Sequence, residues 1–127
     1  MIEIPHAPIA ELVGFDLVEA GEGRASVELD PAERHYNPLG TVHGGIAATL
    51  LDSAMGCAVH TTLDEGEAYT TLELKVNYVR AITEATGRVV ATGSVIHRGG
   101  RVATAEARLT DAGGRLLAHG TSTCLIM

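Results

Sequence analysis

Bulky aromatic residues are almost absent from this sequence. Tryptophan does not occur, and aromatic residues make up 3% of the 127 residues, whereas hydrophobic residues make up 46%. We therefore expect an aliphatic core of Ala, Val and Leu in which backbones approach closely. A chain of this length favours one domain, residues 1–127, with a core of modest size.

Basic residues are also scarce. The sequence has 9 Lys and Arg against 16 Asp and Glu, which gives a formal net charge of -7, and Lys75 is the only lysine. This balance disfavours binding to nucleic acid or to an anionic membrane surface. A polyanionic ligand would need a local group of arginines, and Arg98 with Arg101 is the candidate.

Cysteines and long apolar runs are few as well. Cys57 and Cys124 are far apart and form no CxxC pair, which argues against a zinc ribbon or a thioredoxin-type site. Buried free thiols are the favoured interpretation, with a disulfide as the alternative. Asp52 interrupts the longest apolar run, and the N-terminal segment lacks the pattern of a signal peptide. We therefore expect a soluble cytoplasmic protein.

Hydrophobic periodicity predicts the order of the secondary-structure elements. A short helix over 5–13 precedes two strands over 15–20 and 25–29, and a loop over 31–43 leads into a long helix from Gly44 to about Leu63. Four more strands follow, at 69–78, 88–97, 101–110 and 116–125. One helix between two groups of strands indicates an α+β domain, with an antiparallel sheet wrapped around an apolar, buried helix. Exposed sheet edges then favour self-association.

Residues 35–63, HYNPLGTVHGGIAATLLDSAMGCAVHTTL, combine a turn-rich loop with the start of the long helix. Gly44 and Gly45 open the helix, where backbone N–H groups have no partner and favour negative charge. Asp52 is an acid in an otherwise apolar run, and such a group is costly unless it is paired or used. Gly56, four positions later on the same face, predicts a close neighbour. Together these features indicate a site that holds a polarised oxygen near a carboxylate.

The element order and the motif HxNxxGxxHGGxxxxLxD resemble those of the hotdog-fold acyl-CoA thioesterases, in particular the PaaI-like, phenylacetate-pathway branch. In this chain the motif positions are His35, Asn37, Gly40, His43, Gly44, Gly45, Leu50 and Asp52. The resemblance implies a hotdog fold, in which two subunits form a continuous sheet, as a homodimer or as a homotetramer of two dimers. It also implies an acyl-CoA substrate and no cofactor or metal, because CoA is part of the substrate.

The same resemblance assigns roles across the dimer interface. Asn37 and Gly44 of one subunit would face Asp52 of the other, and Thr71 falls where relatives carry a Ser or Thr that orients the attacking water. His43 would orient the loop or the substrate. Substrate-binding positions would be Gly45 and the hairpin Arg98, Gly99, Gly100 and Arg101, which resembles the hairpin near the CoA nucleotide in relatives.

The chemistry of these residue types agrees with thioester hydrolysis. The Gly44 N–H and the Asn37 amide are donors for the negative charge that builds on the carbonyl oxygen. Asp52 is suited to activate water as a general base or to attack directly and form a mixed anhydride. The sequence leaves this choice open.

Simpler structural roles are the alternatives for each position. Asp52 could pair with a strand arginine, the two glycines could only shape the start of the helix, and Asn37 could be a turn residue. His43 could bond a backbone carbonyl, and the arginine hairpin could be a solvated tip. For the whole protein, a non-catalytic acyl-CoA-binding module is the alternative, and Asp52 argues against it. A hotdog dehydratase would need a differently spaced Asp/His pair, which is not found.

Overall fold

The computed structural model describes residues 3–127. Its elements are two helices, two short 3-10 turns and six strands. In chain order these are α1 (Pro8–Val13), β1 (Phe15–Gly21), β2 (Arg24–Leu29), the 3-10 turn Glu33–His35, α2 (Gly44–His60), β3 (Tyr69–Tyr78), the 3-10 turn Glu84–Thr86, β4 (Val89–Arg98), β5 (Val102–Asp111) and β6 (Leu116–Ile126). Among these residues, no helix is long and apolar enough to cross a bilayer.

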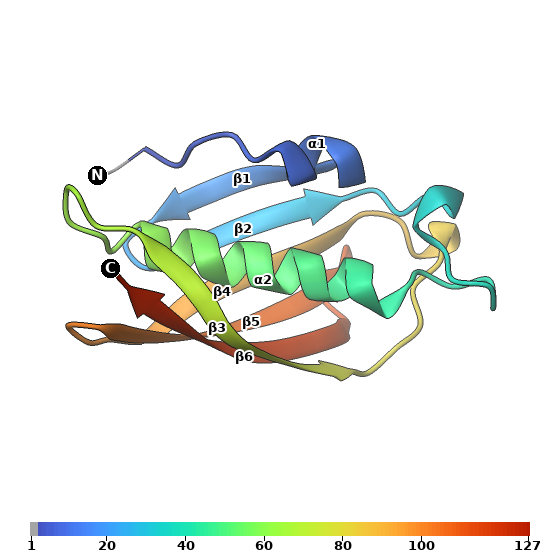
Figure 1. Cartoon of the computed structure of the whole chain (residues 1–127). Helices are drawn as coiled ribbons and strands as arrows, with labels where there is room; N and C mark the ends of the chain where they lie inside the picture. The colour runs from blue at the N-terminus through green and yellow to red at the C-terminus, as the bar shows by residue number, and fades with distance from the viewer. Residues whose placement is uncertain (1–2) are drawn as a thin grey trace.

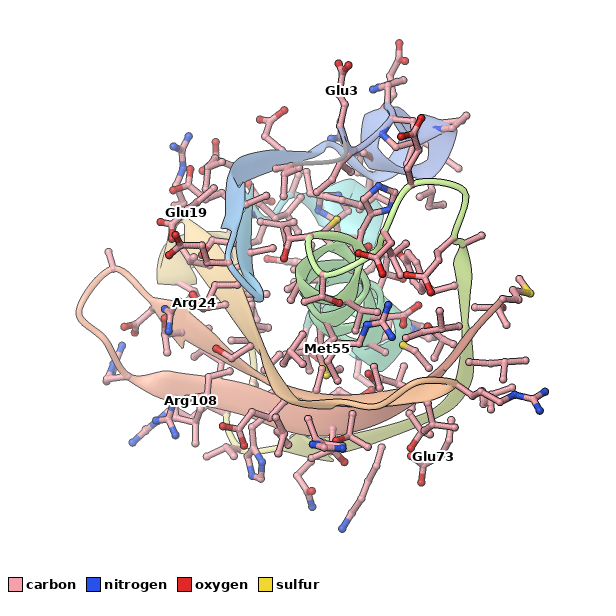
Figure 2. All side chains as sticks on the ribbon, turned by 90° about the vertical axis from the view of Figure 1, so that its left-hand side faces the viewer. Glu3, Glu19, Arg24, Met55, Glu73 and Arg108 are labelled. Atoms are coloured by element: carbon pink, nitrogen blue, oxygen red, sulfur yellow. The ribbon has the colours of Figure 1, made fainter. Side chains whose placement is uncertain are left out.

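All six strands form one antiparallel sheet that curls around α2 (Figure 1). The strand order is β1-β2-β4-β5-β6-β3, so β1 and β3 are the two edges. Figure 2 looks along α2 and shows Met55 pointing from the helix toward the sheet, with Arg24 and Arg108 on the outer face. This arrangement confirms the predicted α+β hotdog architecture.

Small residues allow α2 to lie directly against the sheet. A Cβ on Gly93 of β4 would lie 2.5 Å from the Ala54 carbonyl oxygen of the helix. Ala54, Met55 and the facing Ala105 are fully buried. The scarcity of aromatic residues thus serves a core in which backbones, more than large side chains, determine the spacing between helix and sheet.

Both helices are shorter than the sequence predicts. α1 begins at Pro8 rather than Pro5, with a proline in its first turn, where a missing N–H costs nothing. α2 ends at His60 rather than near Leu63. The hydroxyls of Thr61 and Thr62 donate to the carbonyls of Ala58 and Val59, each at 2.7 Å, and so cap the last turn of the helix.

The prediction that α2 is buried on every side is wrong for one stripe. Its half-buried positions, on the face away from the sheet, are Ala48, Thr49, Asp52, Ser53 and Cys57. The sheet covers the opposite face of α2, whereas the stripe with Asp52 faces the gap between the edge strands β1 and β3. The stripe that carries Asp52 is therefore accessible, as a catalytic acid requires.

Candidate active site

The loop before α2 is held in a closed conformation by its own backbone. Tyr36 and Val42 form an isolated antiparallel bridge, and the His43 N–H donates to the His35 carbonyl at 2.8 Å. Asn37 braces the inside of this loop: its Oδ1 accepts from Leu39 N–H at 2.8 Å, and its Nδ2 donates to the Thr41 hydroxyl at 2.9 Å. One of its two amide hydrogens is thereby used in the loop.

His43 caps α2 with its ring. The Gly45 N–H donates to Nδ1 of His43 at 2.7 Å, which leaves the proton of the neutral imidazole on Nε2. A Cβ on Gly45 would lie 2.9 Å from that same Nδ1, so the cap requires glycine. His43 therefore has a structural role as the helix cap, and its exposed Nε2–H remains a donor at the helix start.

Gly44 opens the helix with an unused donor. Within residues 3–127, no acceptor bonds its N–H. A cleft of about 520 Å³ lies beside it, formed mainly by residues 41–45 and 78–82. Asn37 does not line this cleft, so the structure does not bring its amide directly to Gly44.

Tyr78 is a neighbour of this site that sequence reasoning missed. Its hydroxyl donates to the Gly44 carbonyl at 2.7 Å, and its ring would lie 3.1 Å from a Cβ on Gly44. The contact ties the end of β3 to the start of α2. No sequence signal could have found it, because the bond is to a backbone oxygen 34 residues away. The exposed Arg80 lines the same cleft and places a positive charge near the donor.

Asp52 of α2 and Thr71 of β3 lie side by side within one chain, a contact that was not predicted from the sequence. The Thr71 hydroxyl donates to Asp52 Oδ1 at 3.0 Å, and Asp52 is half-buried. Among residues 3–127, no arginine or lysine forms an ion pair with Asp52. The alternative of a structural salt bridge to a strand arginine is therefore not realised within the described chain, and the carboxylate keeps capacity for a further donor.

A larger groove of about 1060 Å³ is lined by Thr71 but not by Asp52. It is bounded by residues 3–7 and α1, by the start of β1, by Ser53, Cys57 and His60 of α2, and by Tyr69–Thr71 of β3. The close neighbour predicted for Gly56 is Tyr69, whose hydroxyl would lie 2.6 Å from a Cβ there. Burial raises the pKa of Tyr69 to about 12, so this phenol stays neutral.

The two cysteines are free thiols. Cys124 is buried, whereas Cys57 is half-buried on the α2 stripe, so the predicted burial holds fully for Cys124 only. Desolvation raises the pKa of both thiols, and the charge of Asp52 adds to this effect. His35 is a buried structural residue: its Nε2 donates to the Val13 carbonyl at 2.7 Å and its Nδ1 accepts from the Ala32 N–H at 2.9 Å.

The arginine hairpin lies far from Gly44 in the same chain. It connects β4 and β5 at the C-terminal end of α2, whereas Gly44 is at the other end (Figure 1). Arg98 forms an ion pair with Glu67 at 2.5 Å, while Arg101 is exposed. Gly99 fits the turn because a Cβ would lie 2.7 Å from the Val102 carbonyl oxygen; Gly100 has open space around it.

Gly44 and Asp52 do not converge within one chain. They are eight positions apart on α2, a rise of about 12 Å at 1.5 Å per residue. One thioester carbonyl cannot contact both groups of the same helix. Within the described residues, no cluster of three metal-ligating side chains was found either.

Comparisons with known proteins agree with the fold and the motif. Residues 39–118 match the family model described as Thioesterase superfamily. The chain is 29% identical to the 1,4-dihydroxy-2-naphthoyl-CoA hydrolase of Listeria monocytogenes, covering 93% of this chain and 94% of the relative. It is 32% identical to human acyl-coenzyme A thioesterase 13, covering 84% and 76%.

Solved structures give the same result. A conserved protein from Pseudomonas aeruginosa superposes with a TM-score of 0.90 at 35% identity, covering 96% of this chain and 95% of the other. The phenylacetic acid degradation-related protein of Ralstonia eutropha superposes with a TM-score of 0.86 at 25% identity, covering 96% and 92%.

Proposed function

Because this chain belongs to the thioesterase superfamily and has the hotdog fold of acyl-CoA thioesterases, we propose that it hydrolyses an acyl-CoA or aryl-acyl-CoA thioester with Asp52 as the reacting acid. The observation that carries this assignment is the Thr71–Asp52 hydrogen bond of 3.0 Å on the accessible stripe of α2. The products are the free acid and CoA.

Two copies of the chain supply one site in this proposal. The rise of about 12 Å from Gly44 to Asp52 along one helix rules out a shared carbonyl, whereas an antiparallel second helix brings Gly44 of one copy to Asp52 of the other. The two copies pair through edge strand β3, because its Thr71 bonds to Asp52 and its Tyr78 bonds to Gly44 of α2. The apolar side chains of Leu72, Tyr78 and Val79 at this edge are at least half exposed.

Each residue then has a defined task. The Gly44 N–H donates to the carbonyl oxygen, where charge builds in the transition state, and removing one such donor typically costs about 10²–10³ in rate. Asn37 holds the loop and offers its second amide hydrogen to the same oxygen. Thr71 holds the Asp52 carboxylate, which activates water or attacks the carbonyl. His43 sets the helix start through Gly45.

The CoA part of the substrate is assigned to the arginine hairpin of the partner copy. Antiparallel pairing at β3 carries the partner's hairpin to the end of the site where Gly44 lies, since the hairpin is next to the start of β3 through the Arg98–Glu67 pair. The exposed Arg101 is free to pair with phosphate, and Gly99 and Gly100 keep the turn tight.

The test is a thiol-release assay on a panel of short, medium, long and aryl acyl-CoAs, with wild type beside Asp52→Asn. The variant keeps the shape and a hydrogen-bond partner for Thr71 but loses the carboxylate, so turnover should fall by about 10²–10⁴. Circular dichroism and size-exclusion chromatography should be unchanged. Wild-type turnover in Asp52→Asn would refute the assignment, and CoA-ester binding without any turnover by wild type would favour the binding module.

A further inference from the structure

A buried thiol stands beside the pair formed by Thr71 and Asp52. Cys124 of β6 is fully buried, and its Sγ lies 3.9 Å from the Thr71 hydroxyl, within the longer reach of a hydrogen bond that involves sulfur. The same hydroxyl donates to Asp52 Oδ1 at 3.0 Å. Side chains from β6, β3 and α2 therefore form one continuous row, which ends at the acid that the proposed function makes reactive.

A β-bulge at Leu72 turns Thr71 toward this thiol. The pairing of β3 with β6 places Thr71 directly opposite Cys124 and then shifts by one residue at Leu72. Because side chains alternate between the two faces of a strand, a regular β3 would keep Leu72 on the inner face with Leu74 and turn Thr71 outward. In the structure Leu72 is 59% exposed instead. The bulge thus replaces an apolar side chain by a hydroxyl at the position opposite Cys124.

The hydrogen atoms of this row can be placed in only one order. A threonine hydroxyl carries a single hydrogen and accepts through its lone pairs. Its hydrogen goes to Asp52, so the thiol is the donor toward Thr71. Desolvation raises the pKa of the Cys124 thiol above its usual value, and the thiol therefore keeps its hydrogen at neutral pH. The two bonds run in one direction, from thiol to hydroxyl to carboxylate, and each polarises the next.

We propose that Cys124 is a positioning residue for Asp52: its thiol donates to the Thr71 hydroxyl and thereby keeps the only hydrogen of that hydroxyl on the carboxylate. This inference rests on the proposed function, in which Asp52 activates water or attacks the thioester. With Oδ1 held by Thr71, Oδ2 is the oxygen that meets the water or the carbonyl carbon. Cys124 is buried and acts only through Thr71.

Ser122 provides a matched control on the same strand. It lies two positions before Cys124, on the same inner face of β6, and is 2% exposed. Its hydroxyl is near the thiol but makes no hydrogen bond within residues 3–127. Ser122→Ala removes a buried polar group that holds nothing in place, so kcat should be unchanged.

A double-mutant cycle on kcat tests whether Cys124 acts through Thr71. Thr71→Val should lower kcat about 10- to 100-fold, because a hydrogen bond to a charged group is lost. Cys124→Ala should lower kcat about three- to tenfold and leave KM unchanged, because a weaker bond is lost and no substrate contact. In the Thr71→Val background, Cys124→Ala should have no further effect on kcat, since the hydroxyl is already absent. Losses that multiply would overturn the proposal, because they would show that Cys124 only fills the core.

Infrared spectroscopy tests the contact without any turnover. The S–H stretching band lies in a region free of other protein bands, and in the Cys57→Ala background it reports Cys124 alone, since the sequence has two cysteines. Thr71→Val should move this band to higher frequency, because the thiol loses its acceptor. A band that does not move would overturn the proposal, even if Cys124→Ala proved too unstable for kinetics.

The band and the activity of Asp52→Asn together separate this inference from the proposed function. An unmoved band with an inactive Asp52→Asn would remove the positioning role of Cys124 and leave Asp52 as the reacting acid. A fully active Asp52→Asn would overturn the proposed function, and the positioning role would fall with it even if the band moved.

Discussion

Mixing two inactive variants should restore activity if the site is shared between copies. The first variant is Asp52→Asn, and the second is Gly44→Pro, which removes the donor N–H. His43 precedes position 44 with φ -58 and ψ 136, a conformation that a following proline accepts. The proline should therefore fit the helix start and change mainly the donor.

The expected recovery follows from counting sites. In a random one-to-one mixture about half of the dimers are mixed, and each mixed dimer has one site with both wild-type groups, so activity should return to about a quarter of wild type. The alternative is a site within one chain. Every copy would then carry one of the two substitutions in its own site, so mixing should restore no activity.

Differently tagged variants, refolded together and purified through both tags, give the mixed dimers for the thiol-release assay. Because the inactive homodimers are then removed, these dimers should reach about half of wild-type activity. Gly44→Ala is the matched control for the second variant: it adds a Cβ near the Tyr78 ring, where 3.0 Å separates it from the hydroxyl, but keeps the N–H. It should retain far more activity than Gly44→Pro. Purified mixed dimers that remain as inactive as each parent would refute the shared site.

Two further predictions concern the core and the thiols. Gly93→Ala should lower the free energy of unfolding, measured by urea titration, by about 1–3 kcal/mol, because the new Cβ would meet backbone atoms of α2. Gly100→Ala is the control and should leave this free energy unchanged, because position 100 has open space around it. Equal stabilities of the two variants would contradict the close packing of α2 on β4. Burial raises the pKa of the Cys57 thiol above 9.0, so less thiolate is present at any given pH. The rate of Cys57 alkylation, measured by peptide mass spectrometry, should therefore still increase beyond pH 9. A rate that levels off below pH 9 would contradict the buried position of this thiol.

Much of the fold was predictable because its signals are local. Alternation of apolar and polar residues identified three of the six strands, and composition with flanking turns identified the other three. The apolar run after Gly44 identified α2. The ends of the helices were less accurate, because Thr61 and Thr62 cap α2 with their side chains. The expected burial of α2 on all sides was wrong, since burial depends on how far the sheet curls and not on the helix sequence.

The candidate site was likewise predictable only where its signals are local in the sequence. The motif located Asp52, Gly44 and His43, whereas the contact between Thr71 and Asp52 is visible only in the structure. Their catalytic roles stay predictions. The bond from Tyr78 to the Gly44 carbonyl and the engagement of Arg98 by Glu67 had no sequence signal, because each joins segments far apart in the chain.

The sequence by itself determined the element order, the helix start at Gly44 and the acid within an apolar helix, because side-chain periodicity and backbone preferences act over a few residues. The tertiary structure decided which stripe of α2 stays open, and that Thr71 of β3 meets Asp52 on this stripe. It also placed β3 as a sheet edge with Glu73 and Lys75 outward. These features depend on strand order and sheet curvature, which arise only when residues distant in sequence pack together.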